Sequence, residues 1–336
     1  MKLKAILGVL ISIIFVYLAF RNVDFGEMLA AMRSANYLWL VPVFFAMLTS
    51  HWLRAVRHHY FLAPIKPVRS HPLFSALMIG YAGNNLLPLR MGEFLRAYAL
   101  GKSQNLSKTS AFATVLVERV VDLLSLLVIL AIAVLVYPLP QNIKNWGYII
   151  FALTVTAIVV MVLLMEKTEA TLAFFEKILP ARLFAGVQKT AHSFLQGFVV
   201  LKRTEHYGKI VLLSLGVWFL YVMVVYLSFY AFDFPQNYAL NLTASLVVLA
   251  TVSIGIMIPA SPGFVGTYHW FCMTSLAFYH VPQSEALSFA VVSHALNTIP
   301  FTLIGLGYFW RENLHFADAV AERELVEQAP PEELPR

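Results

Sequence analysis

Charge is scarce in this sequence. Lys, Arg, Asp and Glu supply only 12% of its 336 residues, whereas about a quarter of an ordinary soluble domain is charged. Cysteine is scarcer still, and the single Cys272 excludes both a disulfide framework and a zinc site built from cysteines. Hydrophobic residues take the place of the missing charge and reach 60% of the chain. This balance predicts an integral membrane protein.

Several sequence signatures of enzymes are also absent. The chain contains no Gly-x-x-x-x-Gly-Lys-[Ser/Thr] loop, so ATP hydrolysis is not expected. It contains no His-Glu-x-x-His motif and no spaced set of Cys and His residues, so neither a metal nor another cofactor is expected. No segment between the apolar runs has the size of a soluble enzyme domain.

Long apolar runs dominate what is present. A bilayer core about 30 Å thick requires roughly 20 helical residues. Six runs are predicted to span the membrane fully: 5–20, 37–53, 110–136, 147–165, 210–232 and 286–310. The first could be mistaken for a signal peptide, but no small-x-small cleavage site follows it, so we interpret it as an uncleaved helix. Residues 1–310 are therefore predicted to form one integral membrane domain.

Two further apolar segments, 72–100 and 238–279, are broken in the middle by Asn, Pro and Gly residues. Broken helices at membrane depth are tolerated only where protein or a water-filled cavity surrounds them. If each segment is a hairpin that returns to its own side, most of the 24 Lys and Arg residues lie on the cytoplasmic side, Arg54 and Arg57 among them. This asymmetry is what the positive-inside rule requires. The sequence thus predicts two re-entrant hairpins in an inner-membrane protein whose termini are both cytoplasmic.

The two predicted hairpins enter from opposite faces of the membrane. Such an arrangement is typical of an inverted repeat with a binding site near the midplane. No internal sequence repetition supports the repeat, so the prediction depends on topology alone. The expected fold class is all-α, a polytopic helix bundle with about six full spans and two broken re-entrant hairpins in an inverted repeat.

Two polar regions flank the last predicted spans. Residues 166–209 form a cytoplasmic connection in which apolar residues recur at helical spacing. This pattern fits helices lying in the membrane interface, and it fits equally a helical hairpin packed on the bundle. Residues 311–336 are predicted to form an acidic cytoplasmic tail.

The first candidate site lies in the break of the first hairpin. Asn84 and Asn85 can satisfy backbone groups that the break leaves open, and Pro88 ends the helix. A new half-helix then directs its positive dipole into the break, where Arg90 and Arg96 could bind a phosphate. Glu93 is placed one turn before the second of these arginines and could pair with it. The alternative interpretation is a structural kink with charges at the interface.

The second candidate site is a charged turn inside the predicted span 110–136. Glu118 and Asp122 are four residues apart and share a helix face, and Arg119 can reach the aspartate. Each charge costs at least about 2.5–3.5 kcal/mol near the bilayer centre, so partners or water are required. These residues could be counter-charges to Arg90 or Arg96, proton carriers, or an ion-pair network that only holds the bundle together.

The third candidate site is the break of the second hairpin. Ser261 and Pro262 are good N-terminal residues for a second half-helix, and Gly263 permits a tight turn. His269 is placed two turns further on, where a satisfied core histidine is favoured over a ligand. The last span adds polar side chains that either line a cavity or bond between helices: Ser293, His294 and Asn297.

These motifs resemble the lysylphosphatidylglycerol synthase transmembrane family, whose members are often called flippase-like, and the membrane half of the multiple peptide resistance factor. The resemblance is carried by N-x-x-P-x-R-x-G-E-x-x-R at 85–96, Glu-Arg-x-x-Asp at 118–122 and the Pro-Gly turn at 262–263. The family's second motif reads P-G-G-x-G-x-x-E. Here Phe264 replaces its second glycine and His269 replaces its glutamate. A role for an acidic residue there is therefore not carried over.

The resemblance implies lipid handling across the inner membrane. Bifunctional members carry a soluble aminoacyltransferase domain after the membrane part, whereas an acidic tail follows here, so lysine transfer is not predicted. The expected function is a flippase or scramblase for a phosphate-bearing head group, with a phospholipid or polyprenyl-phosphate lipid as partner and no nucleic acid. A membrane glycosyltransferase or lipid-modifying enzyme, with Glu93 or Asp122 as general base, is the alternative. A non-transporting partner subunit is a third, and the sequence leaves homo-oligomerisation open.

Overall fold

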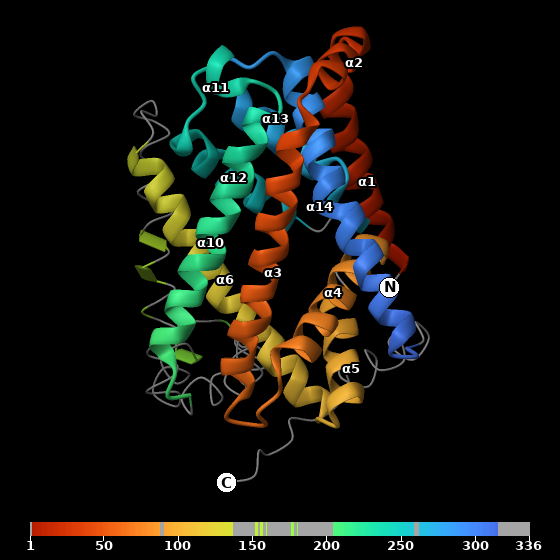
Figure 1. The fold of residues 1–336 in the computed structure, drawn as a ribbon, viewed down its shortest axis with the longest axis vertical. Helices are drawn as coiled ribbons and strands as arrows, with labels where there is room; N and C mark the ends of the chain where they lie inside the picture. The colour runs from red at the N-terminus through yellow and green to blue at the C-terminus, as the bar shows by residue number, and fades with distance from the viewer. Residues whose placement is uncertain are drawn as a thin grey trace.

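The structure, a computed structural model, describes residues 2–87, 91–136, 204–258 and 262–314, with a few isolated positions between 137 and 203. The span predicted at 147–165, most of the connection at 166–209 and the tail after Leu314 lie outside the described residues. Within the described part the chain is helical and forms no strand, so the prediction of an all-α membrane protein is confirmed. The long helices run roughly along the vertical axis of Figure 1: α1 (Lys2–Phe20), α3 (Leu40–Leu62), α6 (Lys108–Val136), α10 (Tyr207–Tyr230) and α14 (Gln283–Arg311).

Length and composition identify three of these helices as able to cross a membrane, namely α3 with its preceding turn, α10 and α14. A fourth is added if α1 and α2 (Phe25–Ser34), which are bent by 84° at their junction, form one span. The outer face of α10 is apolar, as expected for a helix that contacts lipid. Leu212, Leu215 and Phe219 lie on one face at helical spacing and are 60–70% exposed.

Helix α3 is longer than predicted. The sequence predicted a span over 37–53 and placed Arg54 and Arg57 on the cytoplasmic side, but the helix continues to Leu62 and buries both arginines. The predicted end of the span at Leu53 is wrong, because ion pairs inside the bundle allow the helix to continue through both arginines. Carboxylates on α6 neutralise both guanidinium groups, which offsets the cost of burying them.

The first broken segment is a helical hairpin of α4 (Ser70–Leu86) and α5 (Gly92–Gln104), with the break where it was predicted. Glycine is required where these helices cross. A Cβ on Gly92 would lie 2.0 Å from the carbonyl oxygen of Gly80, and a Cβ on Gly83 would lie 2.8 Å from the Cα of Gly92. The hairpin is therefore held by direct backbone-to-backbone contact.

The second broken segment is a hairpin of α12 (Leu242–Met257), the short turn η3 (Pro262–Phe264) and α13 (Thr267–Ala277). Its turn requires glycine, because Gly263 has φ 68°. The two hairpins begin at opposite ends of the bundle, with α5 at the lower end and α11 (Phe234–Asn237), just before α12, at the upper end in Figure 1. Their turns meet, since a Cβ on Gly263 would lie 3.5 Å from the carbonyl oxygen of Asn85.

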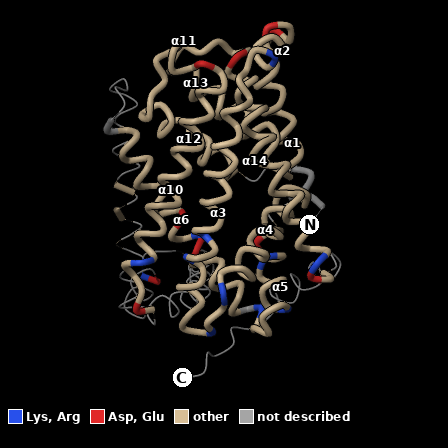
Figure 2. The backbone as a smooth tube through the Cα atoms, viewed as in Figure 1, with Lys and Arg blue, Asp and Glu red and all other residues tan. Residues whose placement is uncertain are grey.

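Helix α14 ties both turns together. Asn85 Nδ2 donates to Thr302 Oγ1 at 2.8 Å, and His294 Nε2 lies 2.7 Å from the carbonyl oxygen of Gly263. Figure 2 shows that most Lys and Arg residues of the described chain lie in the lower half of the bundle, around α4 and α5. The meeting point of the hairpins and the charged region together define where a functional site could be.

Candidate functional site

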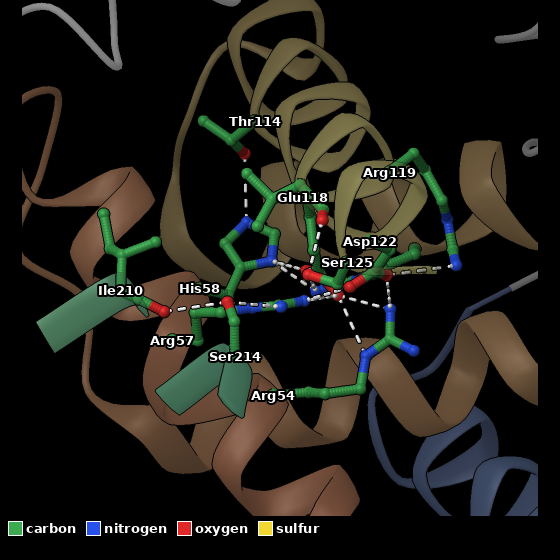
Figure 3. Close-up of polar contacts among 12 residues, drawn as sticks. Arg54, Arg57, His58, Thr114, Glu118, Arg119, Asp122, Ser125, Ile210 and Ser214 are labelled. Carbon is green, nitrogen blue, oxygen red and sulfur yellow. Dashed lines mark hydrogen bonds and ion pairs between the residues drawn. The ribbon is translucent and has the colours of Figure 1, made fainter. Parts of the chain in front are cut away.

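The charged turn of α6 forms the centre of the candidate site (Figure 3). Glu118 is fully buried, and Asp122 lies one turn further along the same face. Arg119 lies 3.8 Å from Asp122 within the same helix, so the predicted pair is present. Because two carboxylates lie on one helix face in an apolar bundle, cations must come from neighbouring helices.

Helix α3 supplies two of these cations. Arg54 binds both carboxylates through one guanidinium nitrogen, Nη2, which lies 2.5 Å from Glu118 Oε1 and 2.7 Å from Asp122 Oδ2. Arg57 Nη2 lies 2.6 Å from Asp122 Oδ1, and its Nη1 donates to Ser214 of α10 at 3.0 Å. The charged groups thus connect α3, α6 and α10.

Helix α5 supplies a third cation, Arg96. Arg96 Nη2 donates to Glu118 Oε2 at 2.7 Å and also contacts His58 of α3. The predicted counter-charge between Arg96 and Glu118 is therefore confirmed. The predicted pair of Glu93 with Arg96 is wrong, because Glu93 instead lies 3.4 Å from Arg119. Arg96 pairs instead with Glu118, a fully buried carboxylate on the neighbouring helix α6.

The two asparagines of the first hairpin have different partners. Asn84 Oδ1 accepts a hydrogen bond from the Gly92 backbone N–H at 2.9 Å, which caps the start of α5. Its Nδ2 donates to Glu93 at 3.4 Å. Asn85 reaches α14 instead, as described above. The predicted role at the break is thus confirmed for Asn84, whereas Asn85 binds α14 and not the break.

An internal cavity of about 620 Å³ opens beside the charged groups. Apolar side chains from α6, α10, α12 and α14 form most of its wall, Leu126, Trp218 and Val252 among them. Charged and polar side chains form a strip on another part of the wall: Arg54, Tyr81, Asn84, Asn85, Glu93, Arg119, Asp122 and Tyr221. The cavity is therefore amphipathic, as required for a ligand that has both a polar and an apolar part.

The predicted site residues divide into four groups. Those that line the cavity are Asn84, Asn85, Glu93, Arg119 and Asp122. Arg96 and Glu118 lie behind the wall and bind its lining residues or each other. Arg90 and Ser261 lie outside the described residues. Pro262, Gly263 and His269 form the second hairpin turn and the start of α13.

His269 has the core role that the sequence favoured. Its Nδ1 accepts a hydrogen bond from the Gly266 backbone N–H at 3.3 Å, at the start of α13. Its ring packs against that of His294, with centroids 4.8 Å apart. This histidine therefore stabilises the second hairpin turn from within.

The cations of α3 are the site residues that the sequence analysis missed. A signal was available, because Arg54, Arg57 and His58 are spaced three and four residues apart and share one helix face. The predicted span ended with the apolar run at Leu53, so these three residues were not assigned to the helix. Tyr81 and Tyr221, which both accept hydrogen bonds from Arg54 Nη1, carried no comparable pattern.

Apolar helices, a buried charged cluster and an amphipathic cavity define an integral membrane protein with a polar region inside its helix bundle. Residues 5–305 match the family described as the lysylphosphatidylglycerol synthase TM region. The chain belongs to this family, and the predicted resemblance is confirmed.

Archaeal relatives resemble the chain over most of its length. A UPF0104 membrane protein of Methanothermobacter thermautotrophicus is 25% identical, over 96% of this chain and 98% of the relative. A UPF0104 membrane protein of Methanocaldococcus jannaschii is 22% identical, over 90% of this chain and 93% of the relative. Glycosyltransferase AglD of Haloferax volcanii is 23% identical over 97% of this chain, which covers 57% of that longer protein.

Proposed function

We propose that this protein is a lipid transporter of the flippase or scramblase type that moves a phosphate-bearing head group across the inner membrane. The observation that carries this proposal is the amphipathic cavity of about 620 Å³ at the meeting point of two hairpins. A head group would occupy the charged strip, and the acyl chains would lie along the apolar wall or remain in the bilayer. Membership of a lipid-related membrane family supports the same function.

The proposed topology has about six full spans and two re-entrant hairpins in an inverted repeat, with both termini cytoplasmic. Two features of the structure support it. The hairpins begin at opposite ends of the bundle and their turns meet, and the basic residues gather around the first hairpin (Figures 1 and 2). Rocking of one half against the other would expose the cavity alternately to each side. No ATP-binding loop occurs in the sequence, so transport would be passive or coupled to an ion.

The arginines that face the cavity are the proposed head-group ligands. Arg54 and Arg119 line the charged strip directly. Glu118 and Asp122 orient these arginines, and Arg96 supports Glu118 from behind. Arg90, next to the start of α5, remains a proposed phosphate ligand.

Purified protein in liposomes that contain fluorescent lipids tests the proposal. Head groups that become accessible to a membrane-impermeant quencher, without covalent change to the lipid, are the expected result. The alternative of a glycosyltransferase or lipid-modifying enzyme is favoured by the similarity to AglD, and it predicts a new lipid species. If neither the accessibility of the head groups nor the lipid species changes, the result favours a partner subunit and contradicts both other functions.

Alanine in place of Arg90 is expected to abolish head-group transport while the protein still reaches the membrane at its normal level. The reason is the loss of a guanidinium that binds phosphate bidentately. Initial rates of quencher accessibility measure the effect. Arg33→Ala, on the exposed helix α2, is the matched control. Normal transport by the Arg90 variant would remove this residue from the site.

A further inference from the structure

One histidine in the wall of the cavity takes no part in the ion pairs of the charged cluster. His51 of α3 is only 5% exposed and lines the cavity. Its ring packs against those of Tyr81 on α4 and Phe301 on α14, with centroids 4.6 and 4.4 Å away. Its Nδ1 is buried and has no hydrogen-bond partner among the described residues. Buried polar atoms normally have a partner, so this nitrogen requires an explanation.

The imidazole of His51 is free to bind a proton. A neutral imidazole carries one N–H and one lone pair, and the lone pair can accept a second proton. No hydrogen bond to Nδ1 has to break for this to happen. His58, two turns further along α3, differs because its Nε2 lies 3.0 Å from Thr114 Oγ1 and its Nδ1 lies 3.0 Å from Glu118 Oε2. His51 is therefore the better candidate for a proton that enters through the cavity.

Arg54 lies close enough to influence a proton on His51. It follows His51 by one helical turn, and Tyr81 contacts both side chains. Arg54 Nη1 donates to the Tyr81 hydroxyl at 3.1 Å, while His51 packs on the Tyr81 ring. A cation on His51 is repelled by this guanidinium as long as the cavity holds no anion. A phosphate bound to Arg54 reverses the balance, because its negative charge attracts both cations.

The carboxylates of the cavity are less suited to carry a proton. Asp122 binds Arg54 at 2.7 Å, and Glu93 lies 3.4 Å from Arg119. A proton on either carboxylate would remove the charge of an ion pair, whereas a proton on His51 removes none. The charged or titratable side chains that line this part of the cavity with His51, from α3 to α6 and α10, are Arg54, Tyr81, Glu93, Arg119, Asp122 and Tyr221.

We propose that His51 binds the coupling proton of transport together with the phosphate-bearing head group. This inference rests on the proposed function and names its coupling ion. As phosphate binds at Arg54, the His51 imidazole takes up one proton and becomes an imidazolium, and both ligands are released on the other side. Each ligand strengthens the binding of the other by the same factor. The proton also cancels one negative charge, which lowers the cost of moving phosphate through an apolar bundle.

A pH gradient across proteoliposomes tests the inference. The probe is phosphatidylglycerol with a fluorescent acyl chain, because its phosphodiester has no proton to lose near neutral pH and its own charge stays constant. One coupled proton biases the distribution by up to about tenfold per pH unit. With a gradient of about two units, the wild-type protein is expected to move on the order of tenfold or more probe away from the acidic side than toward it. A pH-sensitive dye in the lumen should report protons that move with the probe.

Glutamine in place of His51 is the decisive variant, because it keeps a polar side chain but binds no proton near neutral pH. His51→Gln is expected to abolish both the bias and the proton movement, so that any remaining movement of the probe is equal in both directions of the gradient. A purely structural role for His51 would instead slow movement in both directions and keep the bias. His71→Gln, which changes an exposed histidine of α4, is the matched control and should keep the full bias.

The wild-type measurement decides the matter by itself if the variant does not fold. Movement of the probe at equal rates in both directions, without a change in luminal pH, would overturn this inference and leave the proposed function standing. A full bias in His51→Gln would also overturn the assignment. No movement of the probe under any gradient would contradict the proposed function for an anionic phosphodiester, and this inference with it.

Discussion

Replacing Glu118 by glutamine is expected to lower the free energy of unfolding by about 3–5 kcal/mol, because the change leaves buried arginines without their shared carboxylate. Glu118 Oε1 accepts from Arg54, and its Oε2 accepts from Arg96. Glutamine has nearly the same shape, so packing is kept while the charge is lost. Arg54 and Arg57 keep Asp122, whereas Arg96 keeps only His58 as a partner.

The melting temperature of the protein in detergent, together with the yield of monodisperse protein, measures this loss. Glu205→Gln removes the same charge from an exposed position and is expected to change stability by less than about 0.5 kcal/mol. Glu118→Asp keeps the charge and should lie between the two. A wild-type melting temperature for Glu118→Gln would mean that the cluster does not hold α3, α5 and α6 together.

Local chemistry made the broken helices predictable. Asparagine, proline and glycine interrupt otherwise apolar segments, and these residues act through their own backbone geometry and nearby hydrogen bonds. The break between α4 and α5 and the turn at Gly263 were therefore visible without any partner. The charged turn at Glu118 was visible for a related reason, since three charges in one turn of an apolar helix require an explanation.

Pairings between distant helices could not be read in the same way. Arg54 looks like the end of a span because its partner Glu118 is 64 residues away in the chain. The choice of Arg96 between Glu93, three residues away, and a carboxylate on α6 depends on how α5 packs against α6. Only the folded arrangement shows which carboxylate is closer and more deeply buried. The sequence therefore identifies the charged residues of the site, but which of them pair depends on how the helices pack.

Replacing Gly305 by alanine is expected to destabilise the protein by about 1–3 kcal/mol or more, through overpacking between α14 and α4. A Cβ at this position would lie 2.2 Å from the carbonyl oxygen of Met78 and 2.8 Å from the Cβ of Ala82. The nearest obstacle is backbone, which cannot rotate away as a long side chain could. The two helices must therefore separate, and each hydrogen bond that depends on their spacing is weakened.

The bond most exposed to this separation joins Asn85 to Thr302, which precedes Gly305 by three residues on α14. Since Asn85 also lines the cavity, the change should reduce head-group transport as well as the melting temperature. Gly307→Ala is a closely matched control, because a Cβ there meets no atom within 4 Å. Alanine favours helix over glycine by about 0.8–1 kcal/mol, so this variant should be as stable as the wild type or more so. If both variants melted and transported alike, close contact between α14 and the first hairpin would not support the cavity.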